Sequence, residues 1–209
     1  MSELTFVNLK PAHAAQLAQL QLICFPTTPP DELFTESDFL HHATLFPEGT
    51  FVGLDRDQVV ALGAGIFLDF DFAHPQHTLD EITGGGKYEA HNPDGDYYYG
   101  TDISVHPEYR RRGIGKQLYA LRKDVVIRYN KKGIVAGGVL PGFVHHKDKI
   151  SALAYVTQVS AGKLYDPTLS FQVENGFEVR GVLKDYFPDS LSDGWASLIV
   201  WENPQYQND

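Results

Sequence analysis

The sequence predicts an α/β fold, and three features of its middle third support that prediction. An apolar run from Tyr97 to Val105 predicts a β-strand. A short turn rich in arginine and glycine follows, and apolar residues then recur at helical spacing over Ile114–Tyr129. A second apolar run, Gly133–Leu140, predicts the next strand. Further strands and helices are expected on both sides of this core unit.

The N-terminal third is expected to form a strand, two helices and a pair of strands. Apolar and polar residues alternate from Leu4 to Leu9, as in a half-buried strand. Helical spacing of apolar residues over Ala12–Cys24 predicts a helix, which prolines then end. The sequence Thr35–Asp38 resembles a capping box and predicts a second helix start. Two strands, over residues 50–54 and 58–70, flank an Asp-Arg-Asp turn.

The rest of the chain combines two irregular segments with short regular elements. Residues 71–96 are rich in Gly, His, Pro and Asp, and loops of this length are often binding loops or lids. A second irregular segment begins at Pro141. Two helices and two closing strands are expected at Ile150–Val159, Pro167–Asn175, Phe177–Leu183 and Ala196–Trp201. We therefore expect a single domain over residues 1–209, with insertions near residues 71–96 and 141–165.

Regular alternation in the strand Tyr97–Val105 predicts two faces. The first would carry Tyr97, Tyr99, Thr101, Ile103 and Val105, and the second Tyr98, Gly100, Asp102 and Ser104. The three consecutive tyrosines are therefore expected to divide between core packing and a ligand-facing surface.

The turn after this strand has the chemistry of a pyrophosphate site. Arg110–Arg112 lead into Gly113 and Gly115, where the helix opens. Glycine lets the backbone approach a ligand closely, and the first amides of a helix lack internal partners and carry partial positive charge. Spacing excludes two other phosphate motifs, since a dinucleotide fingerprint needs glycine at Leu118 and a Walker A loop needs serine or threonine at Gln117.

The charge distribution agrees with an anionic cofactor held at one place. The net charge of −10 argues against nucleic acid as a partner, yet nine of the 17 basic residues lie within residues 110–132. Of these nine, Arg122, Lys123 and Arg128 are expected to form a solvated helix face. The remaining chain is strongly acidic, which would favour cationic acceptors such as amines.

Several function classes are excluded by composition. No apolar run approaches the roughly 18 residues that a membrane-spanning helix requires. The N-terminus has neither the basic region nor the apolar core of a signal peptide, and the single cysteine, Cys24, excludes an internal disulfide. We therefore expect a cytoplasmic protein without a membrane partner.

The pattern Arg110-x-x-Gly113-x-Gly115 after Ile103–Val105 resembles motif A of the GNAT superfamily of N-acetyltransferases. The resemblance extends over residues 50–203 and includes a late helix that ends in Gly-Phe. The late segment around Leu164–Gln172 also resembles acetyltransferase domains that occur fused to carbon–nitrogen hydrolases. The resemblance implies a mixed central sheet of about seven strands, flanked by helices, whose motif strand splays from its neighbour.

The same resemblance implies a function and a set of site residues. It implies transfer of an acyl group, acetyl in the simplest case, from acyl-CoA to a primary amine of a small molecule or peptide. The strand backbone would hold the pantetheine arm and the turn the pyrophosphate. The implied acetyl-CoA-binding residues are Ile103, Ser104, Val105, Arg110, Arg111, Arg112, Gly113, Ile114, Gly115 and Lys116. Many relatives dimerise, so the resemblance allows a homodimer.

Residues for proton transfer depart from the family pattern. Tyr99 stands where many relatives carry a glutamate, and Gln172 stands where many carry a tyrosine that protonates the thiolate. Tyr165 is a candidate substitute acid, and Asp102 is a candidate base acting through water. Packing for the tyrosine and a satisfied hydrogen-bonding role for the aspartate are the alternatives. A second function is therefore an acetyl-CoA-binding sensor or interaction module with little catalytic activity.

The nine histidines do not predict a metal site. They are scattered, no pair has the helical spacing of zinc ligands with a carboxylate third ligand, and cysteine support is absent. We expect solvated loop histidines and no metal. The acceptor pocket is expected to be shaped by residues 27–40, 71–96 and 141–146.

Overall fold

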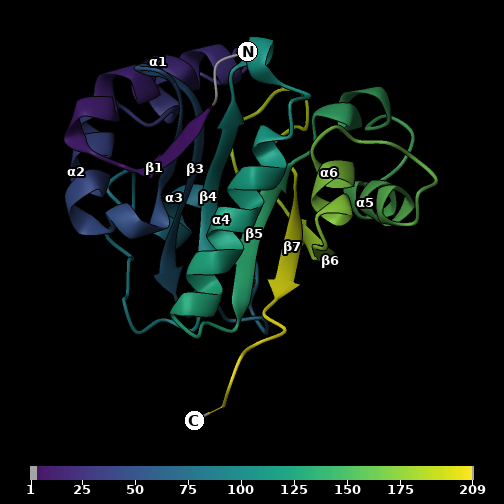
Figure 1. Ribbon diagram of the computed structural model, residues 1–209. Coiled ribbons are helices and arrows are strands. Elements are labelled where there is room, and N and C mark those ends of the chain that lie inside the picture. Colours follow the sequence, from purple (N-terminus) through teal and green to yellow (C-terminus); the bar gives the residue numbers. More distant parts are fainter. Residues whose placement is uncertain (1–3, 209) are drawn as a thin grey trace.

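A single mixed sheet organises the computed structural model, which describes residues 4–208 (Figure 1). Its strands are β1 (Thr5–Asn8), β2 (Phe51–Asp55), β3 (Gln58–Leu68), β4 (Tyr97–Val105), β5 (Gly133–Val139), β6 (Glu178–Leu183) and β7 (Ala196–Glu202). The spatial order is β1-β2-β3-β4-β5-β7-β6, and β4 and β5 form the parallel pair among antiparallel neighbours. The predicted α/β fold with about seven strands is confirmed.

Six α-helices occur among the described residues. They are α1 (Ala14–Cys24), α2 (Glu36–Leu45), α3 (Leu79–Thr83), α4 (Ile114–Arg128), α5 (Ala152–Ser160) and α6 (Leu169–Glu174). The capping box predicted at Thr35 is present, because the Thr35 side chain accepts from the Asp38 amide and Asp38 reaches back to Thr35. Thr78 forms the same capping box at the start of α3, and the Ser151 side chain caps α5 by accepting from the Ala154 amide.

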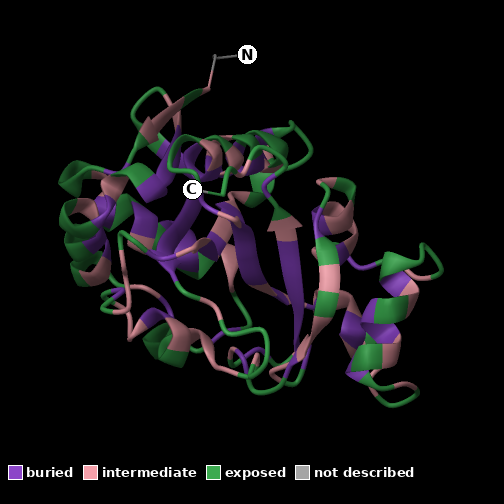
Figure 2. Cartoon of the chain, turned by 90° about the horizontal axis from the view of Figure 1, so that it is seen from below, coloured by how far each residue is buried: buried purple, intermediate pink, exposed green. Residues whose placement is uncertain are grey.

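The helices form two layers around the sheet. Buried side chains of α4, α5 and α6 pack on one face, together with β-strand residues such as Phe67 and Ile134. Helices α1 and α2 pack on the other face against Leu62 and Ala64, and the segment around α3 extends that layer over Ile66. Seen from below, the buried strands form the centre and the exposed residues lie on the outer helices and loops (Figure 2).

A β-bulge in β4 changes the predicted distribution of its side chains. Asp102 pairs with Ala64 of β3 and Gly100 pairs with Gly65, so Thr101 is an extra residue on β4. The alternation therefore changes phase at the bulge. Tyr98 and Ile103 both pack toward α4, whereas Tyr99 lies in the cluster on the opposite face. The prediction that Tyr99, Thr101 and Ile103 share one face is wrong.

The parallel pairing of β4 with β5 ends soon after it begins. It runs from Tyr97 opposite Gly133 to Gly100 opposite Ala136, and then stops, although β4 continues to Val105 and β5 to Val139. The two strands diverge beyond this point, so one edge of β4 has no strand partner there in the part of the chain that the structure describes. This is the splayed motif strand that the sequence resemblance implied.

Arg122 does not belong to a solvated helix face. Its side chain is 2% exposed, and its Nη2 donates to the Ala64 carbonyl at 2.6 Å. The guanidinium also lies 5.9 Å from the ring centroids of Tyr98 and Tyr119. It therefore sits beneath the bulge rather than in water, while Arg128 is exposed as predicted.

We predict that Leu118→Ala lowers the free energy of unfolding by about 2–5 kcal/mol. Leu118 is fully buried between α4 and the sheet, so truncation leaves a cavity that the surrounding side chains fill incompletely. Urea unfolding monitored by circular dichroism measures the change. Leu22→Ala on α1 is the control: Leu22 is 44% exposed, and its truncation should cost well under half as much. Equal losses would contradict the burial of this α4 face.

Candidate functional site

The start of α4 is an uncapped helix terminus beside the end of β4. Gly113 occupies the N-cap position and no side chain caps this helix, in contrast to the side-chain caps of α2, α3 and α5. Within residues 4–208, the backbone amides of Ile114, Gly115 and Lys116 have no hydrogen-bond acceptor. Free amides at a helix start form a site of partial positive charge that suits phosphate oxygens.

The arginines of the turn are exposed and organise their own backbone. Arg110 Nε donates to the Val105 carbonyl at 3.1 Å, which ties the turn to the end of β4. Arg112 Nη2 donates to the Glu108 carbonyl at 2.8 Å, and its guanidinium stacks 4.7 Å from the Tyr109 ring centroid. Most of their N–H donors remain available, because each guanidinium carries five.

The two glycines of the turn serve different geometric needs. Gly113 has φ of 78°, in the left-handed region, and a Cβ there would meet nothing within 4 Å. At Gly115 a Cβ would lie 2.9 Å from the ring of Phe171. Gly115 therefore lets α6 pack against the first turn of α4, a packing reason that the sequence did not reveal.

Residues Ile103, Ser104 and Val105 lie on the part of β4 that has left β5. One edge of this segment pairs with β3, where Val105 is opposite Ala61. The other edge faces the opening between β4 and β5. Backbone groups on that edge are positioned to hydrogen-bond an extended ligand as a missing strand would. The opening and the uncapped α4 terminus lie at the same end of the sheet (Figure 1).

Asp102 is held by hydrogen bonds on the α1 side of β4. Gln21 Nε2 donates to Oδ2 at 2.6 Å and Ser104 Oγ donates to Oδ1 at 2.5 Å. The side chain is 8% exposed, and burial raises the pKa of this carboxyl, while hydrogen bonds from Ser104 and Gln21 and the charge of Arg122 partly offset that effect. Both oxygens are thus engaged, which matches the alternative of a satisfied polar group.

Tyr165, just before α6, is exposed, whereas Gln172 within α6 is buried. The Tyr165 side chain is 71% exposed, and its hydroxyl makes no hydrogen bond within residues 4–208. Gln172 is buried, and its side chain occupies the space where a Cβ at Gly138 would sit. The structure therefore does not bring Tyr165 together with Asp102, because Tyr165 follows α5 whereas Asp102 faces α1.

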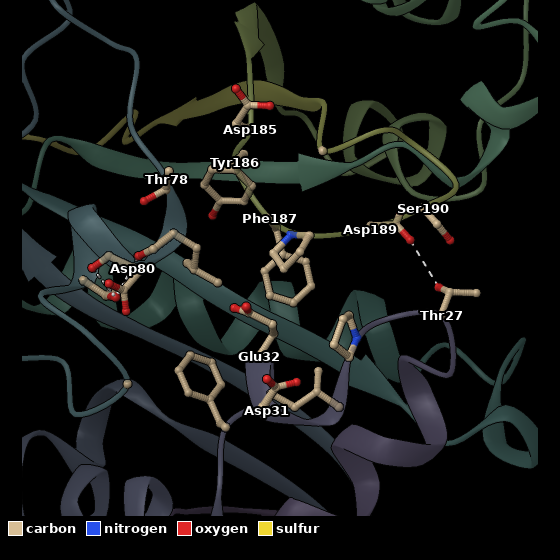
Figure 3. Close-up of a pocket in the computed structure, with 18 of the residues that line it drawn as sticks. Thr27, Asp31, Glu32, Thr78, Asp80, Asp185, Tyr186, Phe187, Asp189 and Ser190 are labelled. Atoms are coloured by element: carbon tan, nitrogen blue, oxygen red, sulfur yellow. Dashed lines mark hydrogen bonds between the residues drawn. The ribbon is translucent and has the colours of Figure 1, made fainter.

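A cavity of about 930 Å³ opens on the α1–α2 side of the sheet (Figure 3). It is lined by residues 27–38, residues 78–86 and the connection between β6 and β7, residues 185–194. The first two segments were expected from the sequence to shape a pocket. Residues 141–146 are absent from the lining, and the β6–β7 connection takes their place.

The cavity is strongly acidic and partly aromatic. Among residues 4–208, seven carboxylates line it, and the lining contains no lysine, arginine or histidine. The acidic lining residues are Asp31, Glu32, Asp38, Asp80, Asp185, Asp189 and Asp193. Phe34, Tyr186 and Phe187 supply aromatic surface, with Tyr186 and Phe187 facing Asp31 and Glu32 across the space (Figure 3). Such a lining favours a ligand that carries positive charge.

Some of the histidines differ from the solvated loop residues that the sequence predicted; His91, for example, accepts from the Phe67 amide and stacks on Phe46. His42 lies on α2, is 1% exposed and stacks on Tyr88 at 3.6 Å between ring centroids. Burial lowers the pKa of His42 to about 4. His77 is half-buried and bonded to Tyr99. Among residues 4–208, no three His, Cys, Asp or Glu side chains converge as a metal-binding group.

Comparison with known proteins assigns the family. The profile of the acetyltransferase (GNAT) family matches residues 14–137, which cover α1 through most of β5. The chain belongs to the GNAT acetyltransferase family. The match includes the Gly113 turn, the opening beside β4 and the α1–α2 wall of the acidic cavity.

Two proteins of Bacillus subtilis (strain 168) are similar along nearly the whole chain. YhcX, named a probable hydrolase, is 36% identical over 95% of this chain, and the chain spans 38% of that protein. YkwB, named an uncharacterized N-acetyltransferase, is 32% identical over 98% of this chain and 91% of its own length. The GNAT unit therefore occurs both within a longer protein and nearly by itself.

Solved structures share the fold at low sequence identity. The loading GNATL domain of CurA from Lyngbya majuscula has a TM-score of 0.84 at 16% identity, over 97% of this chain and 98% of that one. The GphF GNAT-like decarboxylase in complex with isobutyryl-CoA has a TM-score of 0.76 at 18% identity, over 95% of this chain and 99% of that one. Among residues 4–208, no helix has the length and apolar character to cross a membrane.

We predict that Gly113→Val weakens acetyl-CoA binding at least about tenfold while the protein remains folded. A β-branched side chain disfavours the left-handed backbone of the turn by roughly 1–2 kcal/mol and adds bulk beside the free amides. Isothermal titration calorimetry measures the affinity. Gly162→Val is a matched control, because Gly162 also has positive φ (69°) and open space around a Cβ. It should lower the melting temperature similarly and keep acetyl-CoA affinity; equal affinities for both variants would contradict the site.

Proposed function

We propose that this protein is an acyl-CoA-dependent N-acyltransferase that moves an acetyl group to a primary amine. The observation that carries the proposal is the end of β4–β5 pairing at Gly100 and Ala136, beside an uncapped helix start. Unpaired strand backbone suits an extended amide-containing arm, and free helix amides suit the pyrophosphate. Acetyl-CoA carries both groups in one molecule, at opposite ends of its pantetheine arm.

The cofactor-binding roles follow the two halves of this arrangement. Backbone groups of Ile103, Ser104 and Val105 would hold the pantetheine and orient the thioester carbonyl. The amides of Gly113 to Lys116 and the guanidinium groups of Arg110–Arg112 would hold the phosphates. Holding the thioester beside the acceptor supplies the proximity on which amine acetylation depends. A backbone N–H aimed at the carbonyl oxygen would stabilise the negative charge that develops there.

The acceptor would enter through the acidic cavity. Tyr186 lines this cavity, and its ring packs against Gly137, the first β5 residue beyond the β4 pairing. The cavity therefore borders the opening where the thioester would lie. The carboxylates of Asp31, Glu32 and Asp80 make no hydrogen bond or ion pair within residues 4–208, so their charge is available to a ligand. A cationic amine of a small molecule or peptide suits this lining.

Tyr165 and Asp102 retain the candidate roles suggested by the sequence. Tyr165 would protonate the departing thiolate from an exposed position, and Asp102 would act as a base through water. The alternative function, an acetyl-CoA-binding module with little activity, shares the cofactor site and differs only in the chemistry. The cytoplasmic location and a homodimeric state accompany the enzyme proposal as expectations.

Binding and turnover separate these two functions. Calorimetry with acetyl-CoA tests the cofactor site, and thiol release over a panel of amines tests transfer. Micromolar binding with amine-dependent release supports the enzyme. Binding with no release above hydrolysis for any amine would favour the binding module, and no binding of any CoA derivative would contradict both.

We predict that diamines and polyamines are acetylated with at least about fivefold higher kcat/KM than monoamines of equal length, and that salt reduces the difference. Each additional ammonium group gains roughly 1 kcal/mol from opposite charges nearby in a partly solvated site. The double variant Asp31→Asn/Glu32→Gln should lose this preference without weakening acetyl-CoA binding. Glu48→Gln/Asp57→Asn removes the same charge outside the cavity and should keep the preference. Preference for anionic or neutral acceptors would contradict this orientation.

A further inference from the structure

A chain of three side chains runs from the surface loop to the edge of the acidic cavity. His77 Nε2 lies 2.7 Å from the Tyr99 hydroxyl, and that hydroxyl lies 3.1 Å from the hydroxyl of Tyr186. The three come from the 71–96 insertion, from β4 and from the β6–β7 connection. Tyr99 and Tyr186 are buried and His77 is half-buried, so the chain leads from the interior toward solvent.

The loop that carries His77 is tied to the β6–β7 connection. Leu79 N donates to the Tyr186 carbonyl at 2.8 Å, and Gln76 Nε2 donates to the Val182 carbonyl at 2.9 Å. The rings of Tyr99 and Tyr186 stand edge-on to the imidazole, with centroids at 5.5 and 5.7 Å. These contacts fix the imidazole orientation, although the histidine lies in a long insertion.

The hydrogen bonds of His77 define two protonation states of the three linked side chains. Nδ1 lies 2.7 Å from the Pro75 carbonyl, which can only accept, so Nδ1 carries a proton. In the neutral ring Nε2 is then an acceptor, so Tyr99 donates to it and Tyr186 donates to Tyr99. When Tyr99 instead donates to Tyr186, which is the direction that this hydrogen bond has in the structure, Nε2 must also carry a proton and the ring is an imidazolium. The two directions of hydrogen bonding thus differ by one proton on His77.

Tyr186, the inner end of this hydrogen-bonded series, lies where an acceptor amine would meet the thioester. Tyr186 lines the acidic cavity, and its ring occupies the space that a Cβ on Gly137 would need. Tyr99 pairs with Val135, one residue before β4 and β5 separate. The hydroxyl pair therefore sits at the border of the cavity and the strand opening.

We propose, on the basis of the proposed function, that Tyr186, Tyr99 and His77 form a proton relay that deprotonates the acceptor ammonium. The ammonium proton passes to the Tyr186 oxygen as Tyr186 gives its proton to Tyr99 and Tyr99 gives its proton to His77 Nε2. The free amine then attacks the thioester carbonyl, forming the C–N bond, and the C–S bond breaks. The second proton of the nitrogen passes to the departing thiolate, a transfer for which Tyr165 is the candidate acid, and His77 releases the first to water.

The surroundings of His77 keep the relay ready to accept a proton. Burial lowers the pKa of His77, and the Pro75 carbonyl and the Glu81 carboxylate partly oppose this effect, so the ring is neutral at neutral pH. Tyr99, Tyr186 and Glu81 are the titratable groups that face it. Burial raises the pKa of Tyr186 to about 12 and that of Tyr99 well above its ordinary value. Both phenols therefore stay protonated and pass protons on without a lasting charge.

The test is the pH dependence of kcat/KM with an accepted amine, in the full chain. In the wild type kcat/KM should fall as the pH drops through the pKa of His77, below the ordinary value of 6.5. His77→Gln, Tyr99→Phe and Tyr186→Phe should each reduce kcat about 100-fold, the effect of losing a general base. His77→Gln should also remove the acidic limb while leaving acetyl-CoA affinity unchanged.

His74→Gln is the matched control, because His74 is an exposed histidine in the same loop, paired with Asp71. It should keep the wild-type rate and pH profile. An acidic limb that persists in His77→Gln and disappears in Asp102→Asn would overturn the relay and assign the base to Asp102. Unchanged kcat in Tyr99→Phe would overturn it as well.

Imidazole ¹⁵N NMR tests the relay without relying on turnover, so its failure is distinct from failure of the proposed function. At neutral pH the spectrum of the wild type should show His77 protonated at Nδ1, with an Nε2 resonance that shifts in Tyr99→Phe. A neutral ring protonated at Nε2 would overturn the relay even if the protein acetylated no amine.

Discussion

The divergence of β4 from β5 is the constraint on which the rest of this structure depends. Neighbouring parallel strands normally hydrogen-bond to each other along their shared length. Here the pairing of β4 with β5 ends at Gly100 and Ala136. Backbone groups beyond that point have no strand to bond. Because α4 starts directly after β4 and its turn, the same end of the sheet also presents free helix amides. The opening and the helix start therefore lie along one continuous edge of the sheet.

Two buried polar arrangements support the strand at this place. On one face Arg122 bonds the Ala64 carbonyl, opposite the bulge at Thr101. On the other face Asp102 is bonded by Gln21 of α1. A buried charge is costly unless hydrogen bonds replace its water, and both groups have such partners. The geometry of β4 is therefore fixed from both layers and not by the sheet alone.

Local rules in the sequence predicted most of the elements and the phosphate turn. The Thr35 capping box, the Gly113 turn and the order of strands around it depend on neighbouring residues, so they are visible in a linear pattern. The bulge at Thr101 depends on how β4 pairs with β3, and no local pattern marks it. The burial of Arg122 did have a signal, since Arg122 lies four residues after Leu118 and three before Val125 on one helix face.

For the candidate site, too, residues with a local sequence signal were predicted, and residues brought together only by tertiary folding were missed. The turn residues were predicted because glycine and arginine at that spacing imply a phosphate site, and the structure places free helix amides there. The β6–β7 connection was missed as a cavity wall because only the sheet order places it beside the α1–α2 segment. His77 was assigned to solvent because its partners Tyr99 and Tyr186 are 22 residues or more away in the sequence, and tertiary folding alone brings them together.

The absence of any basic residue from the cavity lining has a consequence for the end of a catalytic cycle. Acetylation turns an ammonium group into a neutral amide. A lining of carboxylates that attracts the cation has no comparable hold on the amide, so the charge that draws the amine in is erased by the reaction itself. Under the proposed function, the same carboxylate lining that attracts the amine would hasten release of the amide product without a conformational change.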